Sequence, residues 1–248
     1  FLLIEHEKYG EYMKQLSNFD PEFTILMPCL NERRTLPLCI REIQTFLSDA
    51  DISAEILVAD NGSTDGSPAI ARKMGARVIS VARQGYGNAL TGGINAARGR
   101  YIIMGDCDYS YDFSGLQPFV DALREGYDFV IGNRFSGTME MRAMPFLHRY
   151  LGIPVLSYLG RKRFHTFIYD FHCGLRGFST NAIRSLHLQC TGMEFATEMI
   201  AGFANGKHKI KELPINFRCD KRKGASHLRT FSDGVRHLYF IVCKKPLK

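Results

Sequence analysis

The stretch Arg100-Tyr-Ile-Ile-Met-Gly-Asp106-Cys-Asp108-Tyr-Ser-Tyr-Asp112 decides the fold, because it joins a buried strand to a cluster of acidic residues. Tyr101–Met104 is a short apolar run bounded by glycines, which predicts a strand buried on both faces. Carboxylates crowded at the end of such a strand repel one another and lose hydration, so a cation is expected beside them. A hard divalent ion with oxygen ligands is the natural candidate, and it could also hold a diphosphate.

Part of this acidic cluster has a simpler interpretation. Asp112 precedes Phe113-Ser-Gly-Leu, and an aspartate in that position can cap a helix. An Asp-x-Asp pair also occurs often by chance, so the neighbouring segments must decide between a cation site and ordinary capping.

Length and composition describe one large domain, with or without an appended segment. The chain has 248 residues, 45% of them hydrophobic, which is ample for one core. Seven cysteines without a Cys-x-x-Cys pair argue against a disulfide framework and a zinc ribbon, and favour a reducing compartment. The sequence contains no apolar run of about 18 residues that could span a bilayer.

The positive charge is concentrated at the carboxyl end. Residues 207–248 contain twelve Lys or Arg and three acidic residues, whereas the whole chain has a net charge of +7. Such a segment suits nucleic acid, an anionic membrane surface or phosphate groups, although a solvated basic face would look the same.

Apolar and polar patterns alternate between strand and helix along most of the chain. Strands are predicted at 23–27, 54–59, 77–81, 101–104 and 127–131, with helices between them. A helix that opens at 192–198 and one or two edge strands at 209–217 follow. Short loops in this order predict an α/β fold: a mostly parallel central sheet with helices on both faces. Ligands of such sheets bind beyond the carboxyl ends of the strands, where Asn31/Glu32, Asp60/Ser63/Asp65 and Asp106/Asp108 all fall.

Two later segments are amphipathic. Residues 142–167 are apolar with basic and no acidic residues among them, which favours a helix at a membrane interface, although core packing explains the apolar positions almost as well. The chain ends on a predicted helix with apolar Phe231, Val235, Leu238 and Ile241. We therefore divide the chain into a lead-in (1–22), a catalytic domain (23–230) and a basic, amphipathic juxtamembrane helix (231–248).

Several common sites are absent from the sequence. The chain contains no Gly-x-x-x-x-Gly-Lys-Ser/Thr phosphate loop, and Gly85-Tyr-Gly87 has Leu90 where a dinucleotide fingerprint requires a third glycine. His172-Cys173 has no partner at catalytic spacing, so a structural role is expected.

Taken in order, these motifs resemble the family 2 glycosyltransferases of the GT-A fold. The resemblance covers about residues 23–230 and rests on Pro28-x-x-Asn31-Glu32, Asp60-x-x-Ser63-x-Asp65, the helix after Gly85, Asp106-x-Asp108 and Gly132-Asn-Arg134. Order and spacing match the dolichyl- and polyprenyl-phosphate sugar synthases. Asp170-x-x-x-Gly174-Leu-Arg176 and Arg222-x-Gly224-x-Ser226 resemble later motifs of that branch, most closely its bacterial membrane-bound members.

The resemblance implies a donor site and a metal. Asp106 and Asp108 would hold Mg²⁺ or Mn²⁺ against the diphosphate, and Arg134 would face a donor or acceptor phosphate; these three are the expected catalytic residues. The residues expected to border the nucleotide-sugar are Pro28, Asn31, Glu32, Asp60, Ser63, Asp65, Gly87 and Asp106.

The implied acceptor is a polyprenyl phosphate, to which a hexose from a UDP- or GDP-sugar would transfer with inversion. A phosphate is already an anion, so it needs cations rather than a general base. The candidates that would hold it are Arg134, Arg222, Lys223, Ser226, His227 and Arg229. The resemblance also implies work at the cytoplasmic face of a membrane and leaves no role for nucleic acid.

Other functions stay open at this point. A sugar-hydroxyl acceptor, as in cell-wall or glycan synthesis, would need a carboxylate base, for which Asp170 and Glu194 are candidates. A non-catalytic nucleotide-binding membrane module and a sugar-1-phosphate nucleotidyltransferase are further alternatives. Two departures from the family pattern also matter: the run after Asp108 is Tyr-Ser-Tyr-Asp112, and a usual Ser-Lys-Leu is Ser226-His227-Leu228.

Overall fold

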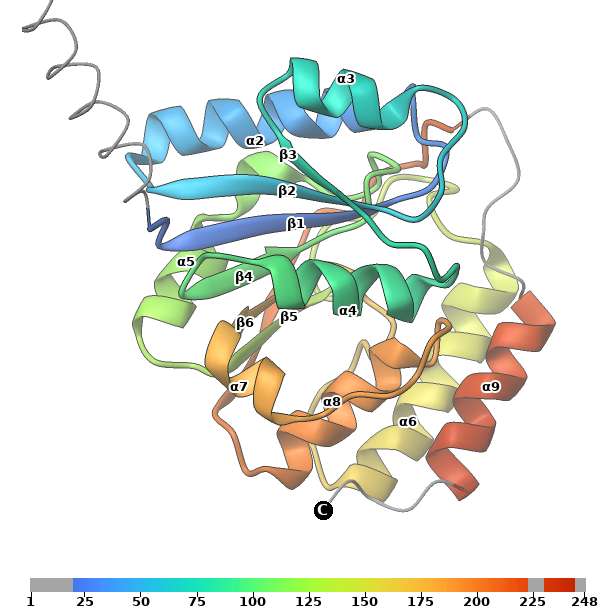
Figure 1. Cartoon of the computed structure of the whole chain (residues 1–248). Helices are drawn as coiled ribbons and strands as arrows, with labels where there is room; N and C mark the ends of the chain where they lie inside the picture. The colour runs from blue at the N-terminus through green and yellow to red at the C-terminus, as the bar shows by residue number, and fades with distance from the viewer. Residues whose placement is uncertain (1–19, 223–229, 244–248) are drawn as a thin grey trace, which may run out of the picture.

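The computed structural model describes residues 20–222 and 230–243, and its centre is a seven-stranded sheet (Figure 1). The strand order is β3-β2-β1-β4-β6-β5-β7. The strands are β1 (Phe23–Cys29), β2 (Ala54–Asp60), β3 (Arg77–Ser80), β4 (Tyr101–Met104), β5 (Phe129–Asn133), β6 (Arg176–Ser179) and β7 (Ile210–Pro214). Only β6 runs antiparallel to its neighbours, so the prediction of a mostly parallel sheet is confirmed.

Parallel pairing brings three strand ends to one edge of the sheet. β1 pairs with β2 on one side, Cys29 opposite Asp60, and with β4 on the other, Leu26 opposite Met104. The carboxyl ends of β1, β2 and β4 are therefore adjacent, and the polar loops that follow them meet there.

Helices cover both faces of the sheet. Two successive residues of β6 point to opposite faces of the sheet. A Cβ on Gly177 would meet Leu123 of α5 (Gln117–Arg124) on one face, whereas Phe178 packs near Phe203 of α8 (Phe195–Asn205) on the other. The α8 face also carries α4 (Tyr86–Ala96), whose Gly93 lies against Leu26 of β1. The other helices of the central region are α2 (Leu36–Ala50), α3 (Ser67–Lys73), η1 (Phe113–Gly115) and α7 (Thr180–Ser185).

The strand β6 and the helix α7 are the elements that the sequence did not predict. Arg176-Gly-Phe-Ser is only four residues long and begins with a charged side chain. β6 nevertheless lies in the middle of the sheet, paired with β4 and β5, because its Arg176 is fully buried and hydrogen-bonded to backbone carbonyls. Four residues of sequence do not indicate that a buried arginine will find hydrogen-bond acceptors elsewhere in the fold.

A pair of helices lies beside this core. The π-helical turn η2 (His148–Gly152) leads into α6 (Ile153–Phe164), which lies next to α9 (Thr230–Cys243) (Figure 1). Phe164 and Phe240 contact each other between the two helices, with ring centroids 6.3 Å apart. In the described part of the chain, no helix combines the length and hydrophobicity needed to cross a bilayer.

Candidate active site

The loops after β1 and β2 are locked together by side chains that the sequence singled out. The amide of Asn31 donates to Ser63 Oγ (2.8 Å), and Asn31 adopts a left-handed φ of 58°, which asparagine tolerates better than most residues. Asp65 accepts from the amides of Arg33 and Ser67, both at 2.9 Å. The hydrogen bonds of Asn31, Ser63 and Asp65 thus fix the shape of this edge.

Asp60, the last residue of β2, stabilises the loop that follows this strand. Its side chain is almost fully buried and accepts from the amides of Gly62 (3.3 Å) and Ser63 (3.3 Å). On the neighbouring strand, the carbonyl of Pro28 accepts from the Cys107 thiol (3.1 Å). Pro28 and Asp60 therefore lie on adjacent strands at the edge where the sequence predicted nucleotide contacts.

Gly87 lies at the start of α4, where it permits a close approach to another segment. A Cβ at this position would come 2.3 Å from the carbonyl oxygen of Cys190, and the Gly87 amide donates to the carbonyl of Thr191 (3.0 Å). The glycine is therefore required for packing of α4 against residues 190–191, and its contact with a nucleotide stays a prediction.

Asp106 and Asp108 follow β4 and have different surroundings. Asp106 Oδ1 accepts from the hydroxyl of Tyr86 (3.0 Å), and burial, followed by the charge of Asp108, raises the pKa of Asp106 to about 6. Asp108 Oδ1 accepts from the amide (2.9 Å) and hydroxyl (2.5 Å) of Ser110. Two negative charges are therefore held at the centre of the predicted site. Tyr86 had no signal in the sequence beyond its place in a glycine-rich segment.

The guanidinium of Arg222 lies among the carboxylates of this site. It donates to Glu32 Oε1 (3.0 Å), Asp108 Oδ2 (3.2 Å) and Asp220 Oδ2 (2.6 Å). Burial raises the pKa of Glu32 to about 7, even though Arg222 opposes that shift. Asp220 was not predicted, because an isolated acid in a basic segment has no motif around it.

This arrangement shows that the carboxylates attract a cation. Three acids surround one guanidinium, so the cluster keeps an excess of negative charge, and carboxylate oxygens are the donors that Mg²⁺ and Mn²⁺ prefer. Within residues 20–222 and 230–243, however, no three His, Cys, Asp or Glu side chains are grouped so as to hold a metal ion. The residues present fit a divalent ion that takes its remaining ligands from a bound molecule.

Arg134 lies in a separate buried ion pair with Asp170. Arg134 Nε and Nη2 donate to the two oxygens of Asp170, both at 2.7 Å, and the amide of Arg134 donates to Asp170 Oδ2. The guanidinium also stacks over the ring of Phe217, 5.2 Å from its centroid. Both oxygens of Asp170 are thus engaged by a fixed cation. The roles of Arg134 toward a phosphate and of Asp170 as a base stay predictions.

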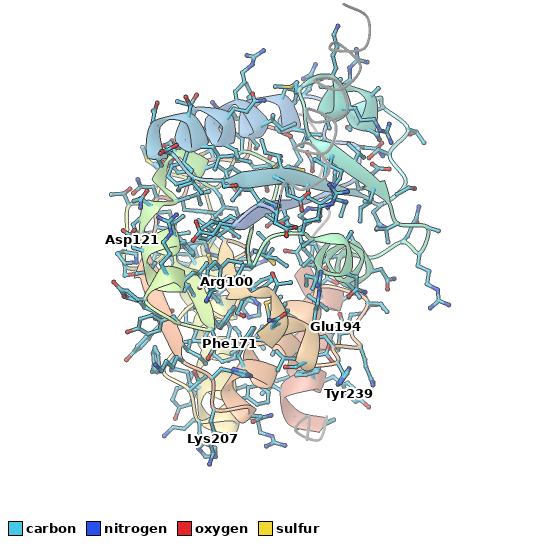
Figure 2. The ribbon with its side chains drawn as sticks, turned by 60° about the vertical axis from the view of Figure 1, so that its left-hand side comes forward. Arg100, Asp121, Phe171, Glu194, Lys207 and Tyr239 are labelled. Atoms are coloured by element: carbon cyan, nitrogen blue, oxygen red, sulfur yellow. The ribbon has the colours of Figure 1, made fainter. Side chains whose placement is uncertain are left out.

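Glu194 immediately precedes α8 (Figure 2). Its Oε1 accepts weakly from the amide of Gly192 (3.4 Å), and its buried Oε2 has no hydrogen-bond partner in the described part of the chain. Glu198, one turn later, accepts from the amides of Gln189 and Cys190. These bonds give Glu198 a structural role through Oε2. Its Oε1 is buried without a hydrogen-bond partner among the described residues, as Glu194 Oε2 is.

Other predicted residues are only partly accounted for. Lys223, Ser226, His227 and Arg229 lie outside the described residues. Asp112 does cap a helix, since its carboxylate accepts from the amide of Ser114 at the start of η1, and it pairs with Arg218. No disulfide bond joins any of the seven cysteines, all of which lie within the described residues.

The α6 and α9 pair presents apolar side chains to solvent. We call these side chains the α6–α9 face; more than a third of each is exposed: Phe146, Leu147, Tyr150, Leu151, Val155, Tyr158, Val235, Leu238, Tyr239 and Val242. Tyr239 on α9 is labelled in Figure 2. Basic residues accompany them, and Arg149 and Arg161 lie over the rings of Tyr150 and Tyr158. Both segments thus combine exposed apolar side chains with basic ones, and their role at a membrane stays a prediction.

Comparison with protein families and curated proteins identifies relatives of the chain. The model of "Glycosyl transferase family 2" matches residues 24–186. A low-salt glycan biosynthesis hexosyltransferase, Agl6, of Haloferax volcanii is 37% identical over 93% of the chain, which spans only 55% of that protein. A dolichyl-phosphate hexose transferase of the same organism is 30% identical over 86% of the chain and 90% of its own length.

Solved structures share the fold. Glucosyl-3-phosphoglycerate synthase of Mycobacterium tuberculosis, crystallised with Mn²⁺, UDP and glucosyl-3-phosphoglycerate, superposes with a TM-score of 0.70 at 18% identity. The match covers 91% of this chain and 83% of that one. Its complex with Mn²⁺ and UDP-glucose gives a TM-score of 0.71, at 19% identity and with 91% and 82% coverage. The GT-A fold expected from the sequence motifs is thereby confirmed.

Proposed function

Because the chain belongs to glycosyl transferase family 2, we propose that it is a hexosyltransferase that moves a hexose from a UDP- or GDP-sugar to a polyprenyl phosphate. The observation that carries this proposal is the cluster of carboxylates around the Arg222 guanidinium, two of which, Glu32 and Asp108, lie beyond the carboxyl ends of β1 and β4. Such a cluster suits a metal-bound diphosphate, and it lies where α/β sheets bind nucleotides.

The donor would lie along this edge. Pro28, Asn31, Glu32 and Asp60 would border its base and ribose, with Ser63, Asp65 and Gly87 shaping the loops around it. Asp106 and Asp108 would hold Mg²⁺ or Mn²⁺, which supplies charge neutralisation for the departing nucleoside diphosphate. The support is the position of the two carboxylates after β4, with Asp108 already paired to a cation, and, for the fold only, the Mn²⁺ and UDP named in the related crystal structures.

The acceptor phosphate requires no base. One of its oxygens would attack the anomeric carbon as the bond from that carbon to the diphosphate oxygen breaks, which inverts the configuration. Arginine suits a phosphate through its bidentate fork. Arg222 is near enough to the donor site to take part, since it pairs with Glu32 and Asp108. The other residues proposed to hold the phosphate follow it in the sequence: Lys223, Ser226, His227 and Arg229. The name of the Haloferax dolichyl-phosphate hexose transferase supports a lipid phosphate acceptor.

A second candidate function is transfer to a sugar hydroxyl. A specific observation favours it: Glu194 keeps a buried carboxylate oxygen without a hydrogen-bond partner in the described part of the chain, as a general base would. Asp170 is the poorer candidate for that role, since both of its oxygens accept from Arg134. A hydroxyl acceptor would make activity depend on Glu194, whereas a phosphate acceptor would not.

We also propose that the α6–α9 face docks on an anionic membrane surface, at the cytoplasmic side. Apolar side chains next to Arg and Lys stems are the pattern of interfacial helices, in which burial of the apolar groups adds to attraction by anionic lipids. A lipid-linked acceptor would then be presented at the same surface as the catalytic domain.

The acceptor class can be tested directly. The protein would be incubated with Mn²⁺, a panel of UDP- and GDP-sugars and a short polyprenyl phosphate, and release of nucleoside diphosphate would be measured with and without the lipid. We expect release from one donor to depend on the lipid phosphate and to survive Glu194→Gln. Release that ignores the lipid and is lost in Glu194→Gln would favour the hydroxyl acceptor instead.

A further inference from the structure

Arg222 occupies the position that a metal-bound donor requires. Its guanidinium makes ion pairs with Asp108, Glu32 and Asp220, and Asp108 is the aspartate expected to bind the metal. A guanidinium and a divalent cation cannot share one carboxylate oxygen without strong repulsion, because both are positive and both need the same lone pairs. The contact of Arg222 with Asp108 therefore competes with metal binding.

The backbone that carries Arg222 is held firmly in place. Residues 217–222, which we call the strap, run beside residues 108–111: Phe217 bridges to Tyr111, and the amide of Lys221 donates to the carbonyl of Asp108 (3.2 Å). Lys221 Nζ also lies 4.0 Å from the centroid of the Tyr109 ring. Because the strap is anchored through its backbone, the Arg222 side chain can leave Asp108 by rotating about its own bonds.

Building on the proposed function, we propose that Arg222 is a displaceable counter-ion. In the donor-free chain its guanidinium pairs with Asp108 and Glu32, and it leaves Asp108 when a divalent cation binds. The freed guanidinium, still tethered beside the donor site, then becomes available to a phosphate group. One residue thus couples occupation of the metal site to binding of the phosphate acceptor, so that the acceptor binds well only after the metal and donor.

Three features of the structure support this exchange. The three carboxylates outnumber the one guanidinium, so the site still attracts positive charge when Arg222 is in place. Asp220, two residues before Arg222, accepts from both Nε and Nη2 of the guanidinium through Oδ2, and the Nε bond can retain the guanidinium after it leaves Asp108. The Asp108 contact, at 3.2 Å, is the longest of these contacts and so the easiest to give up.

The test measures Mn²⁺ binding to the whole chain without nucleotide, by the electron paramagnetic resonance signal of free Mn²⁺. We expect Arg222→Gln to bind Mn²⁺ roughly tenfold more tightly than wild type, because metal binding no longer has to break the ion pairs. Arg218→Gln is the matched control: it removes the same charge from the same strap, but its partners are Glu42 and Asp112. The control should change Mn²⁺ affinity less than threefold, which is roughly the effect of an exposed charge.

The outcomes separate this proposal from the proposed function. Equal affinities for wild type and Arg222→Gln, or equal gains in both arginine variants, would overturn the exchange but leave the transferase proposal standing. Tighter Mn²⁺ binding in Arg222→Gln together with a raised KM for polyprenyl phosphate would support it, since a merely structural residue would weaken both. Absence of Mn²⁺ binding to every form, with or without UDP, would overturn both proposals.

Discussion

Arg134 and Asp170 form a bidentate ion pair, with both N–O distances at 2.7 Å and almost no exposure of either side chain to solvent. The pair joins the end of β5 to the segment before β6, and Arg134 also covers the ring of Phe217 in the strap. Its position at a junction of three segments implies that it stabilises the site as a whole.

Removing one partner of this pair should be strongly destabilising. In Arg134→Ala the Asp170 carboxylate would be left buried without its counter-ion, which typically costs about 3–5 kcal/mol. The free energy of unfolding in urea is the measurement. Arg124→Ala serves as the control, because its pair with Glu22 is partly exposed to solvent and should contribute about 1 kcal/mol or less. A loss of about 1 kcal/mol or less in Arg134→Ala would contradict a structural role for the pair.

Gly174 should be essential for the position of Asp106. A Cβ at residue 174 would come 2.4 Å from Asp106 Oδ2 and 3.1 Å from the Tyr111 hydroxyl, so Gly174→Ala must move the carboxylate. We expect a loss of turnover of roughly a hundredfold, the cost of misplacing a catalytic group by about an ångström. Gly115→Ala is the control, since a Cβ there meets nothing within 4 Å. Wild-type turnover in Gly174→Ala would show that Asp106 need not be held in place.

His237 should make stability depend on pH. Burial between α9 and its neighbours lowers the pKa of His237 to about 4 from 6.5, and its Nδ1 is 2.7 Å from Thr197 Oγ1. As the pH falls below about 6.5, the unfolded chain takes up a proton before the folded chain does, so stability decreases between pH 6.5 and 4. The difference of about 2.5 pKa units corresponds to about 3 kcal/mol.

Unfolding in urea at several pH values checks this prediction. His237→Gln should flatten the profile between pH 6.5 and 4 relative to wild type, although the buried ring of His172, whose pKa burial also lowers, will keep part of the slope. His165→Asn, at the exposed end of α6, should retain the wild-type profile. An unchanged slope in His237→Gln would contradict the assignment.

The α6–α9 face should bind vesicles that contain anionic lipid. Val235→Asp and Val242→Asp replace exposed apolar side chains with negative charge, which both removes hydrophobic burial and repels the lipid. Co-sedimentation with such vesicles should fall at least tenfold for the double variant, whereas Asn95→Asp on α4 should bind like wild type. Equal binding of all forms would place the lipid contact elsewhere on the chain.

The fold followed from the sequence where local patterns are strong. The strand at 101–104 was predicted with its observed bounds, and the alternation of strands and helices indicated parallel pairing and a shared edge for Asp60 and Asp106. β6 was missed because the stability of a buried Arg176 depends on carbonyl acceptors, such as those of Phe171 and Ala196, which only the folded chain supplies.

The sequence predicted which residues form the site but not which of their side chains contact one another. The sequence assigned Arg222 and Asp108 to different substrates, yet their side chains are in contact, because the strap returns to the turn after β4 from more than a hundred residues away. Likewise, Arg134 and Asp170 were assigned separate roles and form one ion pair. Contacts between distant residues depend on the path of the chain, which motif spacing does not encode.

The most direct test of the account concerns Asp108. Lipid-dependent release of nucleoside diphosphate would be measured in the presence of Mn²⁺ for wild type, Asp108→Asn and Asp112→Asn, two isosteric changes in the same segment. Asp108→Asn should lose activity by roughly a thousandfold, since the charge that holds the metal and diphosphate is gone. Asp112→Asn, a helix cap paired with Arg218, should remain active. Full activity of Asp108→Asn would contradict the proposed donor site.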